Sequence, residues 1–300
     1  MLAPARILSR TLLFAAVAAL AAGCGAGSDK TAANVADTVA TEGMVAIQAG
    51  ELHYYPPGEY LKGGYPVSPP LTQISFDSAL YIMQRQVSQA EFTACVQAKA
   101  CKQLDKSQRN ASDPDLPVVG VSWRDATDYA AWLSNETGHH YRLPSFAEWV
   151  HAAGPGYKED IVLDSFDPAD PAQRWLAEYK LETQRQTAVD AQLRPFGSFG
   201  QNEAGMQDMV GNVWDWTDTC HSRYNLDISD TASDAGGARN CGVRVVAGPH
   251  RSVITDFIRD PKGGACSVGI PPSNLGFRLV LDGSAGGAAE PRLMQKLGIG

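Results

Sequence analysis

The most regular pattern of hydrophobic and polar positions lies between Ser122 and Gly138. Apolar side chains recur there at spacings of three and four residues: Ala126, Tyr129, Ala130 and Leu133. This spacing places them on one face of a helix, which we expect to be buried. Ser122 followed by Asp125 has the spacing of a capping box, and Gly138 is suited to ending the helix. The pattern therefore predicts a helix whose apolar face belongs to the core.

The same helix-start pattern, a serine followed three residues later by an acid, occurs twice more, at Ser88 with Glu91 and at Ser145 with Glu148. Strand patterns are short and cover residues 44–48, 80–83, 244–248 and 276–281. The long connections 155–195 and 221–240 are irregular, so metal or disulfides are needed to order them. We therefore expect an α+β domain with low regular secondary structure.

The N-terminus has the pattern of an export signal. Arg6 and Arg10 precede an apolar run over residues 11–22 that is too short to cross a bilayer. Small residues lead into Cys24, which resembles a bacterial lipobox, so cleavage would leave a lipidated Cys24 as the mature N-terminus. An ordinary secretory signal is the alternative. Gly25 after the cysteine favours the outer membrane over the inner one, by resemblance to other lipoproteins.

The domain organisation follows from composition. We expect a lipoprotein signal over residues 1–23, a flexible polar tether over 24–43, one folded domain over 44–282 and a loose tail over 283–300. The formal net charge of -8 argues against nucleic-acid binding and against adsorption to anionic lipid. Attachment to the membrane would therefore depend on the lipid at Cys24, with the domain in the periplasm.

Four segments carry a family resemblance: LPVVGVSWRDATDYAAWL at 116–133, RLPSFAEWVHAAG at 142–154, GMQDMVGNVWDW at 205–216 and NLGFRLV at 274–280. Together they resemble the sulfatase-modifying-factor family, whose founding enzymes convert a substrate cysteine to formylglycine. The resemblance spans residues 44–280. It implies a C-type-lectin-like fold that bound calcium stabilises.

The segment around NVWDW indicates a calcium site. Four residues match the positions that hold calcium in the family: Asp208, Gly211, Val213 and Asp215. Two carboxylates, backbone carbonyls and a glycine for a tight turn supply the hard oxygen donors that calcium prefers. The alternative is that Asp208 caps a turn and Asp215 pairs with a cation, while the neighbouring tryptophans belong to the core.

The catalytic copper site of the family requires two cysteine thiolates, which are soft ligands for Cu(I). Residues 242–265 contain no cysteine, and the family register places Val253 and Ile258 where the pair is expected. Neither side chain binds a metal, so we do not expect copper. Formylglycine formation is correspondingly disfavoured, because function must be argued from the site and not from the fold.

The mature chain has five further cysteines, which export would place in an oxidising compartment. Cys95 and Cys101 lie at the end of a predicted helix and are placed to staple its last turn. Cys220 and Cys241 are expected to pair because relatives often carry a cysteine at both places. Cys266 is then left over, either as a small buried hydrophobe, as a reactive thiol or as one half of an intermolecular bridge.

A polar segment replaces the copper site. It concentrates donors and charges suited to binding an acidic or hydrogen-bonding partner: His250, Arg251, Asp256, Arg259 and Asp260. His250 is also placed among acids as a general base. The alternative is a solvated loop with local ion pairs.

Three hypotheses for function remain. The favoured one is a non-catalytic, lipid-anchored periplasmic domain that binds a periplasmic or membrane protein. One branch of the family regulates a transmembrane threonine kinase beside type VI secretion, and this chain resembles that branch. The second hypothesis is a formylglycine-type oxidase or a related exported oxidoreductase. The third is a structural lipoprotein of the envelope.

Overall fold

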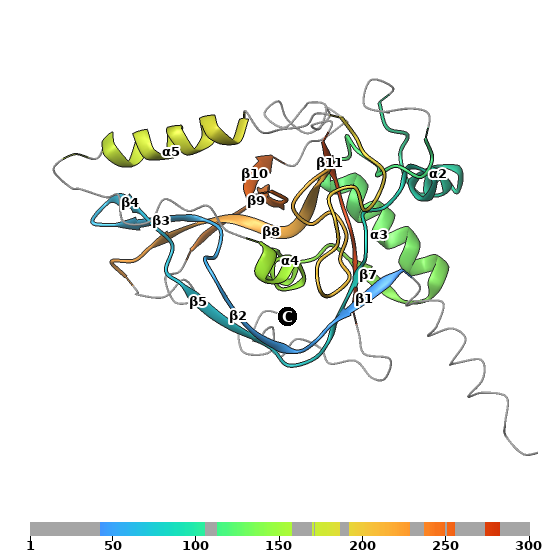
Figure 1. Cartoon of the computed structure of the whole chain (residues 1–300), viewed down its shortest axis with the longest axis horizontal. Helices are drawn as coiled ribbons and strands as arrows, with labels where there is room; N and C mark the ends of the chain where they lie inside the picture. Colours follow the sequence, from blue (N-terminus) through green and yellow to red (C-terminus); the bar gives the residue numbers. More distant parts are fainter. Residues whose placement is uncertain are drawn as a thin grey trace, which may run out of the picture.

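The computed structural model describes residues 43–105, 113–157, 170, 172–186, 192–228, 237–249, 251–255 and 274–282. The predictions for the signal, for most of the tether with Cys24, for Cys266 and for the tail lie outside these residues. Within them, helices are few and the strands form curled sheets (Figure 1). None of the helices described is long and apolar enough to cross a membrane.

The central sheet of four strands joins segments from both ends and the middle of the domain. Its order is β1-β6-β12-β7, with antiparallel pairing throughout. The strands are β1 Met44–Ile47, β6 Leu80–Met83, β7 His140–Arg142 and β12 Val280–Asp282. Val280 pairs with Ile82 on one side and with Arg142 on the other. The last strand, β12, therefore connects β6 to β7 within this sheet.

A second, larger sheet runs β10-β9-β8-β3-β4, with β11 added beside β8. Its strands are β3 Glu59–Lys62, β4 Tyr65–Val67, β8 Trp214–Asn225, β9 Ala238–Ala247, β10 Ser252–Thr255 and β11 Leu275–Gly276. A separate hairpin-like ribbon pairs β2 Gly50–Tyr54 with β5 Thr72–Phe76. The long strands β8 and β9 take up both ends of the connection 221–240 that the sequence predicted to be irregular, over residues 221–225 and 238–240.

All three predicted helix starts are confirmed as capping boxes. They open α2 Gln89–Gln97, α3 Trp123–Thr137 and α4 Phe146–Ala153. At α4, for example, the Glu148 backbone N–H donates to Ser145 Oγ at 3.2 Å, and the Ser145 N–H donates to Glu148 Oε2 at 2.7 Å. Gly138 ends α3 in the left-handed conformation, with φ of 73°, where a glycine avoids the steric cost of a side chain.

Two expectations for secondary structure were wrong. The predicted strand over residues 276–281 is divided into β11 and β12, because β11 pairs with β8 in the large sheet and β12 pairs with β6 and β7 in the other. The second difference is helix α5, Ala172–Gln186, which lies in a stretch expected to be irregular. It sits beside β3 and β4, away from α2 and α3 (Figure 1).

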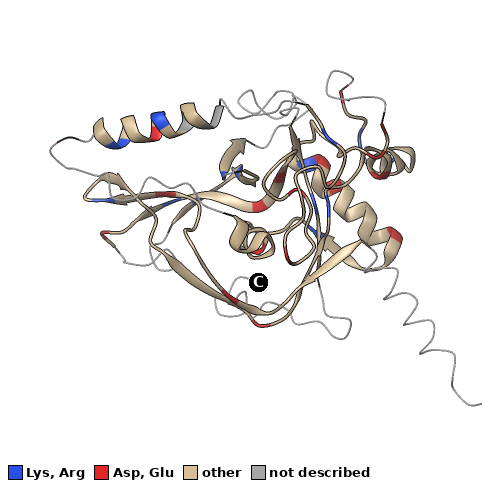
Figure 2. Cartoon of the chain, viewed as in Figure 1, with Lys and Arg blue, Asp and Glu red and all other residues tan. Residues whose placement is uncertain are grey.

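The core lies between the sheets and the three capped helices. Its largest fully buried side chains include Phe146, Trp149, Trp216 and Phe277. Tyr129 on α3 contacts Phe277 edge-on at a ring distance of 5.4 Å, which confirms that the apolar face of α3 is buried. Charged residues of both signs are interspersed along the ribbon (Figure 2).

Candidate functional site

A buried ion pair lies where the two most distinctive sequence segments meet. Arg278 is 0% exposed and Asp215 is 1% exposed. Arg278 Nε donates to Asp215 Oδ2 at 2.6 Å, and Trp149 Nε1 of α4 donates to the same oxygen at 2.8 Å. The rest of the guanidinium donates to the carbonyls of Gln84 and Gln207. Such a pair is tolerated in a core because each charge has several partners.

Asp208 orders the turn that precedes this pair. It is buried and has a positive φ of 52°, a conformation that aspartate adopts more readily than most residues. Its carboxylate accepts from the backbone N–H of Gly197 at 2.7 Å and from that of Phe199 at 2.8 Å. The predicted alternative roles are therefore present: Asp208 holds a turn and Asp215 pairs with a cation.

With these roles filled, two side-chain oxygen atoms near the predicted calcium position still have no hydrogen-bond partner. Asp215 Oδ1 is buried and has no hydrogen-bond partner, and neither has Gln86 Oε1. The Val213 carbonyl is 3.5 Å from Gln86 Nε2, which is a long contact. A buried anionic oxygen without a partner is costly unless a cation satisfies it. Within the set Asp208, Gly211, Val213 and Asp215, the side-chain oxygen left for a hard cation is therefore Asp215 Oδ1, because both Asp208 oxygens accept from backbone N–H groups.

Among the residues described, no group of three or more His, Cys, Asp or Glu side chains is placed to hold a metal ion. The predicted calcium set differs in kind, because half of its donors are backbone carbonyls. Calcium at this position stays a prediction.

The predicted partner-binding segment is described only in part. Arg251 Nη1 donates to the Tyr55 carbonyl at 2.6 Å, which ties the start of β10 to the segment after β2. His250, Asp256, Arg259 and Asp260 lie outside the described residues. On β10 itself, Val253 pairs with Val245 of β9, and its side chain is 46% exposed.

The structure contains both expected disulfides, Cys95–Cys101 and Cys220–Cys241. The first closes the end of α2 in the core. The second joins β8 to β9 close to Arg244, whose guanidinium stacks over the Trp123 ring at 3.9 Å.

Sequence reasoning missed a hollow of about 460 Å³ between α3, β7 and β8, which has both polar and apolar walls. Trp123, Asn135, Arg142 and Asp218 are among the residues that line it. Arg142 Nη2 contacts Glu148 Oε1 at 2.7 Å. Burial by itself raises the pKa of Glu148, but the hydrogen bonds and charge of Arg142 outweigh it and hold that pKa below its ordinary value. No sequence signal marks this hollow, because Asp218 of β8 lies far in sequence from α3 and β7, which form the rest of its wall.

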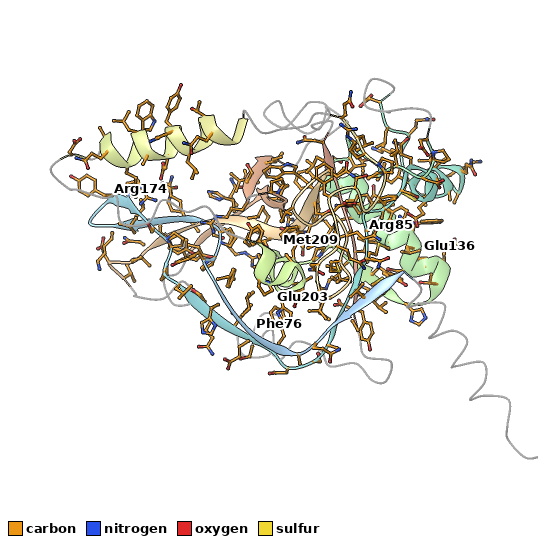
Figure 3. The ribbon with its side chains drawn as sticks, viewed as in Figure 1. Phe76, Arg85, Glu136, Arg174, Glu203 and Met209 are labelled. Carbon is orange, nitrogen blue, oxygen red and sulfur yellow. A yellow bond between two sulfur atoms is a disulfide. The ribbon has the colours of Figure 1, made fainter. Side chains whose placement is uncertain are left out.

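Helix α5 carries an exposed apolar face that sequence reasoning also missed. Trp175 is 63% exposed, Leu176 is 55% exposed and Tyr179 is 62% exposed. The rings of Trp175 and Tyr179 stack with their centroids 5.7 Å apart. Arg174 instead lies toward β3 and β4 (Figure 3), where it donates to Ser68 Oγ at 3.4 Å. The helix thus turns a charged residue inward and its aromatic residues outward, which is typical of a surface that contacts something else.

Comparison with known proteins places the chain in a family. The model of the "Sulfatase-modifying factor enzyme 1-like domain" matches residues 30–283. The chain therefore belongs to the sulfatase-modifying-factor family, and the mixed α/β fold with few helices agrees with this membership.

Relatives in the family differ in their named activities. The chain is 33% identical over 186 residues to "Formylglycine-generating enzyme" of Streptomyces coelicolor, covering 59% of this chain and 57% of the relative. It is 29% identical to "Inactive C-alpha-formylglycine-generating enzyme 2" of Bos taurus, covering 59% and 52%. It is also 29% identical to "Serine/threonine-protein kinase pkn1" of Chlamydia pneumoniae, covering 54% and 23%. The chain spans little more than half the length of the first two relatives.

Among solved structures, PvdO from Pseudomonas aeruginosa is similar in fold. The TM-score is 0.50 at 22% identity, and the match covers 79% of this chain and 93% of that one. At this identity the likeness concerns the fold alone.

Proposed function

We propose that this protein is a non-catalytic sulfatase-modifying-factor-like domain that regulates another protein by binding it. The proposal rests on the identity of the side chain at position 253. The family register predicts the first copper thiolate at this position, and the side chain there is a half-exposed valine on β10. A valine cannot hold Cu(I), and residues 242–265 contain no cysteine that would serve instead.

Two further observations support a binding role. The aromatic face of α5 exposes Trp175 and Tyr179, residue types enriched at protein interfaces. The similarity to a relative named as inactive is compatible with loss of catalysis within the family. A binding surface that combines the segment after Gly248 with the face of α5 would suit a partner that has both acidic and apolar groups.

The similarity to a protein named as a serine/threonine kinase supports a kinase-associated context. We therefore infer that the partner belongs to a threonine-kinase pathway of the type VI secretion kind. The domain would act in the periplasm and be held at the outer membrane by lipid on Cys24. These finer assignments rest on the N-terminal pattern and on the family resemblance.

We also infer that calcium binds at Asp208, Gly211, Val213 and Asp215. The support is the buried Asp215 Oδ1 without a partner. When bound, the ion would neutralise this oxygen and cross-link the loop. The same loop leads into β8 and contains Asp215, which pairs with Arg278. Because β8 is an inner strand of the larger sheet, we expect an ordered loop to stabilise that sheet.

A pull-down of the exported protein from envelope extract, followed by mass spectrometry, tests the proposal. We expect one partner to be enriched, and to be lost both with Arg251→Glu and with Trp175→Ala combined with Tyr179→Ala. Lys102→Glu reverses an exposed charge after α2, which lies away from α5 (Figure 1), and this variant should retain the partner. Retention of the partner by all variants, or the absence of any enriched protein, would contradict the proposed surfaces.

The second candidate function is formylglycine formation or a related oxidation. The observation in its favour is the 33% identity to a formylglycine-generating enzyme. It would require a route that does without the copper thiolates, with His250 as the nearest candidate base. An assay for aldehyde formation on a cysteine-containing peptide, with copper and oxygen present, separates this candidate from the binding role.

A further inference from the structure

The two disulfides of this protein have opposite surroundings. Cys95 is 0% exposed and Cys101 is 7% exposed, and both belong to the main hydrophobic cluster. In the other bond, Cys220 is buried at 5% exposure but Cys241 is exposed to solvent. A thiol in solution can therefore approach the second disulfide from the exposed residue Cys241, whereas both cysteines of the first disulfide are buried.

The exposure of Cys241 comes from an irregularity in the pairing of β8 with β9. Cys220 pairs with Arg244, but the next residue, His221, pairs with Asn240. Residues 241–243 therefore have no partner on β8. The Gly242 N–H donates to Asn240 Oδ1 at 3.1 Å and holds this bulge in shape. Bulges of this kind re-aim side chains out of the sheet, which leaves Cys241 at the surface.

Two arginines contact the buried sulfur. Arg244 Nη1 lies 3.4 Å from Cys220 Sγ, and Arg239 Nη2 lies 3.6 Å from it. If the bond opened with Cys220 as the leaving group, the new thiolate would form between two guanidinium groups. Nearby cations stabilise a thiolate, and a more stable leaving thiolate speeds exchange.

We propose that Cys220–Cys241 is a site of thiol–disulfide exchange, with Cys241 as the attacked sulfur and a dithiol as the reductant. This inference goes beyond the proposed binding function and does not depend on it. One thiolate of the reductant attacks Cys241 Sγ, the Cys220–Cys241 bond breaks, and Cys220 leaves as a thiolate. The second thiolate of the reductant then attacks the mixed disulfide and releases Cys241. The reductant ends as a disulfide, and the protein gains two electrons and ends with two thiols.

Exchange at this site would alter a defined region and leave the fold intact. Arg244 also donates to the Asp218 carbonyl at 2.8 Å and covers the Trp123 ring. Trp123 and Asp218 both line the hollow between α3, β7 and β8. A full negative charge on Cys220 would therefore form beside the wall of that hollow. Meanwhile the ladder from Trp216 to Val246 and the Cys95–Cys101 bond remain in place.

Graded reduction of the purified exported protein tests this inference, with Cys95–Cys101 as an internal control. The protein is treated for a fixed short time with increasing dithiothreitol, quenched, alkylated and analysed by peptide mass spectrometry. We expect Cys220 and Cys241 to be alkylated at roughly a tenfold lower reductant concentration than Cys95 and Cys101. With glutathione as a monothiol probe, the trapped adduct should lie on Cys241. Simultaneous reduction of both bonds, or an adduct on Cys220, would overturn the inference.

A pair of arginine variants tests the role of the guanidinium groups. Arg239→Gln removes an exposed cation that contacts Cys220 Sγ, so more dithiothreitol should be needed to open this bond. Arg223→Gln removes an exposed cation from the same sheet that pairs with Glu59 instead, and it should leave the reduction curve unchanged. Equal curves for the two variants would show that the arginine contact does not favour opening and would overturn this part of the mechanism.

Discussion

Asp215 of β8 and Arg278, which lies between β11 and β12, form an ion pair with an Nε–Oδ2 distance of 2.6 Å at almost complete burial. The pair joins the start of β8 in the larger sheet to residues 277–279, which connect β11 with β12 of the four-stranded sheet. It also includes the Trp149 indole, so that α4 is tied to the same point. Two of the four segments that carry the family resemblance, GMQDMVGNVWDW and NLGFRLV, thus meet through one carboxylate.

We expect Arg278→Met to be strongly destabilising, because it leaves the Asp215 carboxylate buried without its cation. The free energy of unfolding should fall by about 3–5 kcal/mol, as measured by urea denaturation. Arg223→Met breaks an exposed ion pair with Glu59 and should cost less than about 1 kcal/mol. A small effect of Arg278→Met, similar to that of the control, would show that the pair contributes little to stability.

Calcium should raise the thermal stability of the protein relative to chelator, since an ion bound only by the folded state stabilises it. Asp215→Ala is expected to lower the melting temperature in calcium buffer and to abolish the difference between calcium and chelator. Asp218→Ala removes a half-exposed carboxylate three residues later and should retain that difference. If the wild-type protein melts at the same temperature in both buffers, the calcium loop is wrong.

Stability should depend on pH through Glu148. Burial alone raises its pKa, but Arg142 and the Ser145 backbone N–H reverse the direction and lower it from 4.5. Because the folded-state pKa is the lower one, the ionised carboxylate stabilises the fold above pH 4.5, and this contribution is lost as the pH falls toward the folded-state pKa. Glu148→Gln should therefore reduce stability at pH 7 by about 1–3 kcal/mol and flatten the acid limb of the stability curve.

Glu91 provides a matched control for this pH dependence. It forms the same capping box on α2 and pairs with Arg85, but its side chain is 43% exposed against 14% for Glu148. Solvent screening weakens an exposed pair, so Glu91→Gln should flatten the curve less. An equal effect of the two substitutions would show that burial of Glu148 is not what matters.

We expect no formylglycine formation by the wild-type protein. A cysteine-containing peptide incubated with the protein, copper and oxygen should gain no aldehyde above that seen with copper alone, as judged by peptide mass spectrometry. The physical reason is that Val253 offers no donor for Cu(I) where a thiolate is needed. Turnover of the peptide would contradict the non-catalytic proposal and favour the oxidase.

Part of the site was predictable from sequence because its signals are local. The turn role of Asp208 and the ion-pair role of Asp215 were the alternatives that the sequence offered, and both disulfides were expected from cysteine placement and family resemblance. Calcium at these positions stays a prediction. Arg278 was missed, although an arginine inside the apolar run NLGFRLV is a visible anomaly. The outward aromatic face of α5 was missed as well, because residues 155–195 were expected to be irregular and no helix was predicted there.

The sequence by itself determined the features that a few neighbouring residues can settle. The three serine–acid pairs begin helices, and Gly138 ends one, because caps are satisfied within a single turn of backbone. Only the tertiary structure decided that residues 275–282 serve two sheets, that Arg278 meets Asp215, and that Cys241 is exposed while Cys220 lies between two arginines. These features depend on backbone pairing and burial between segments far apart in the chain, and no local pattern specifies which distant groups will meet.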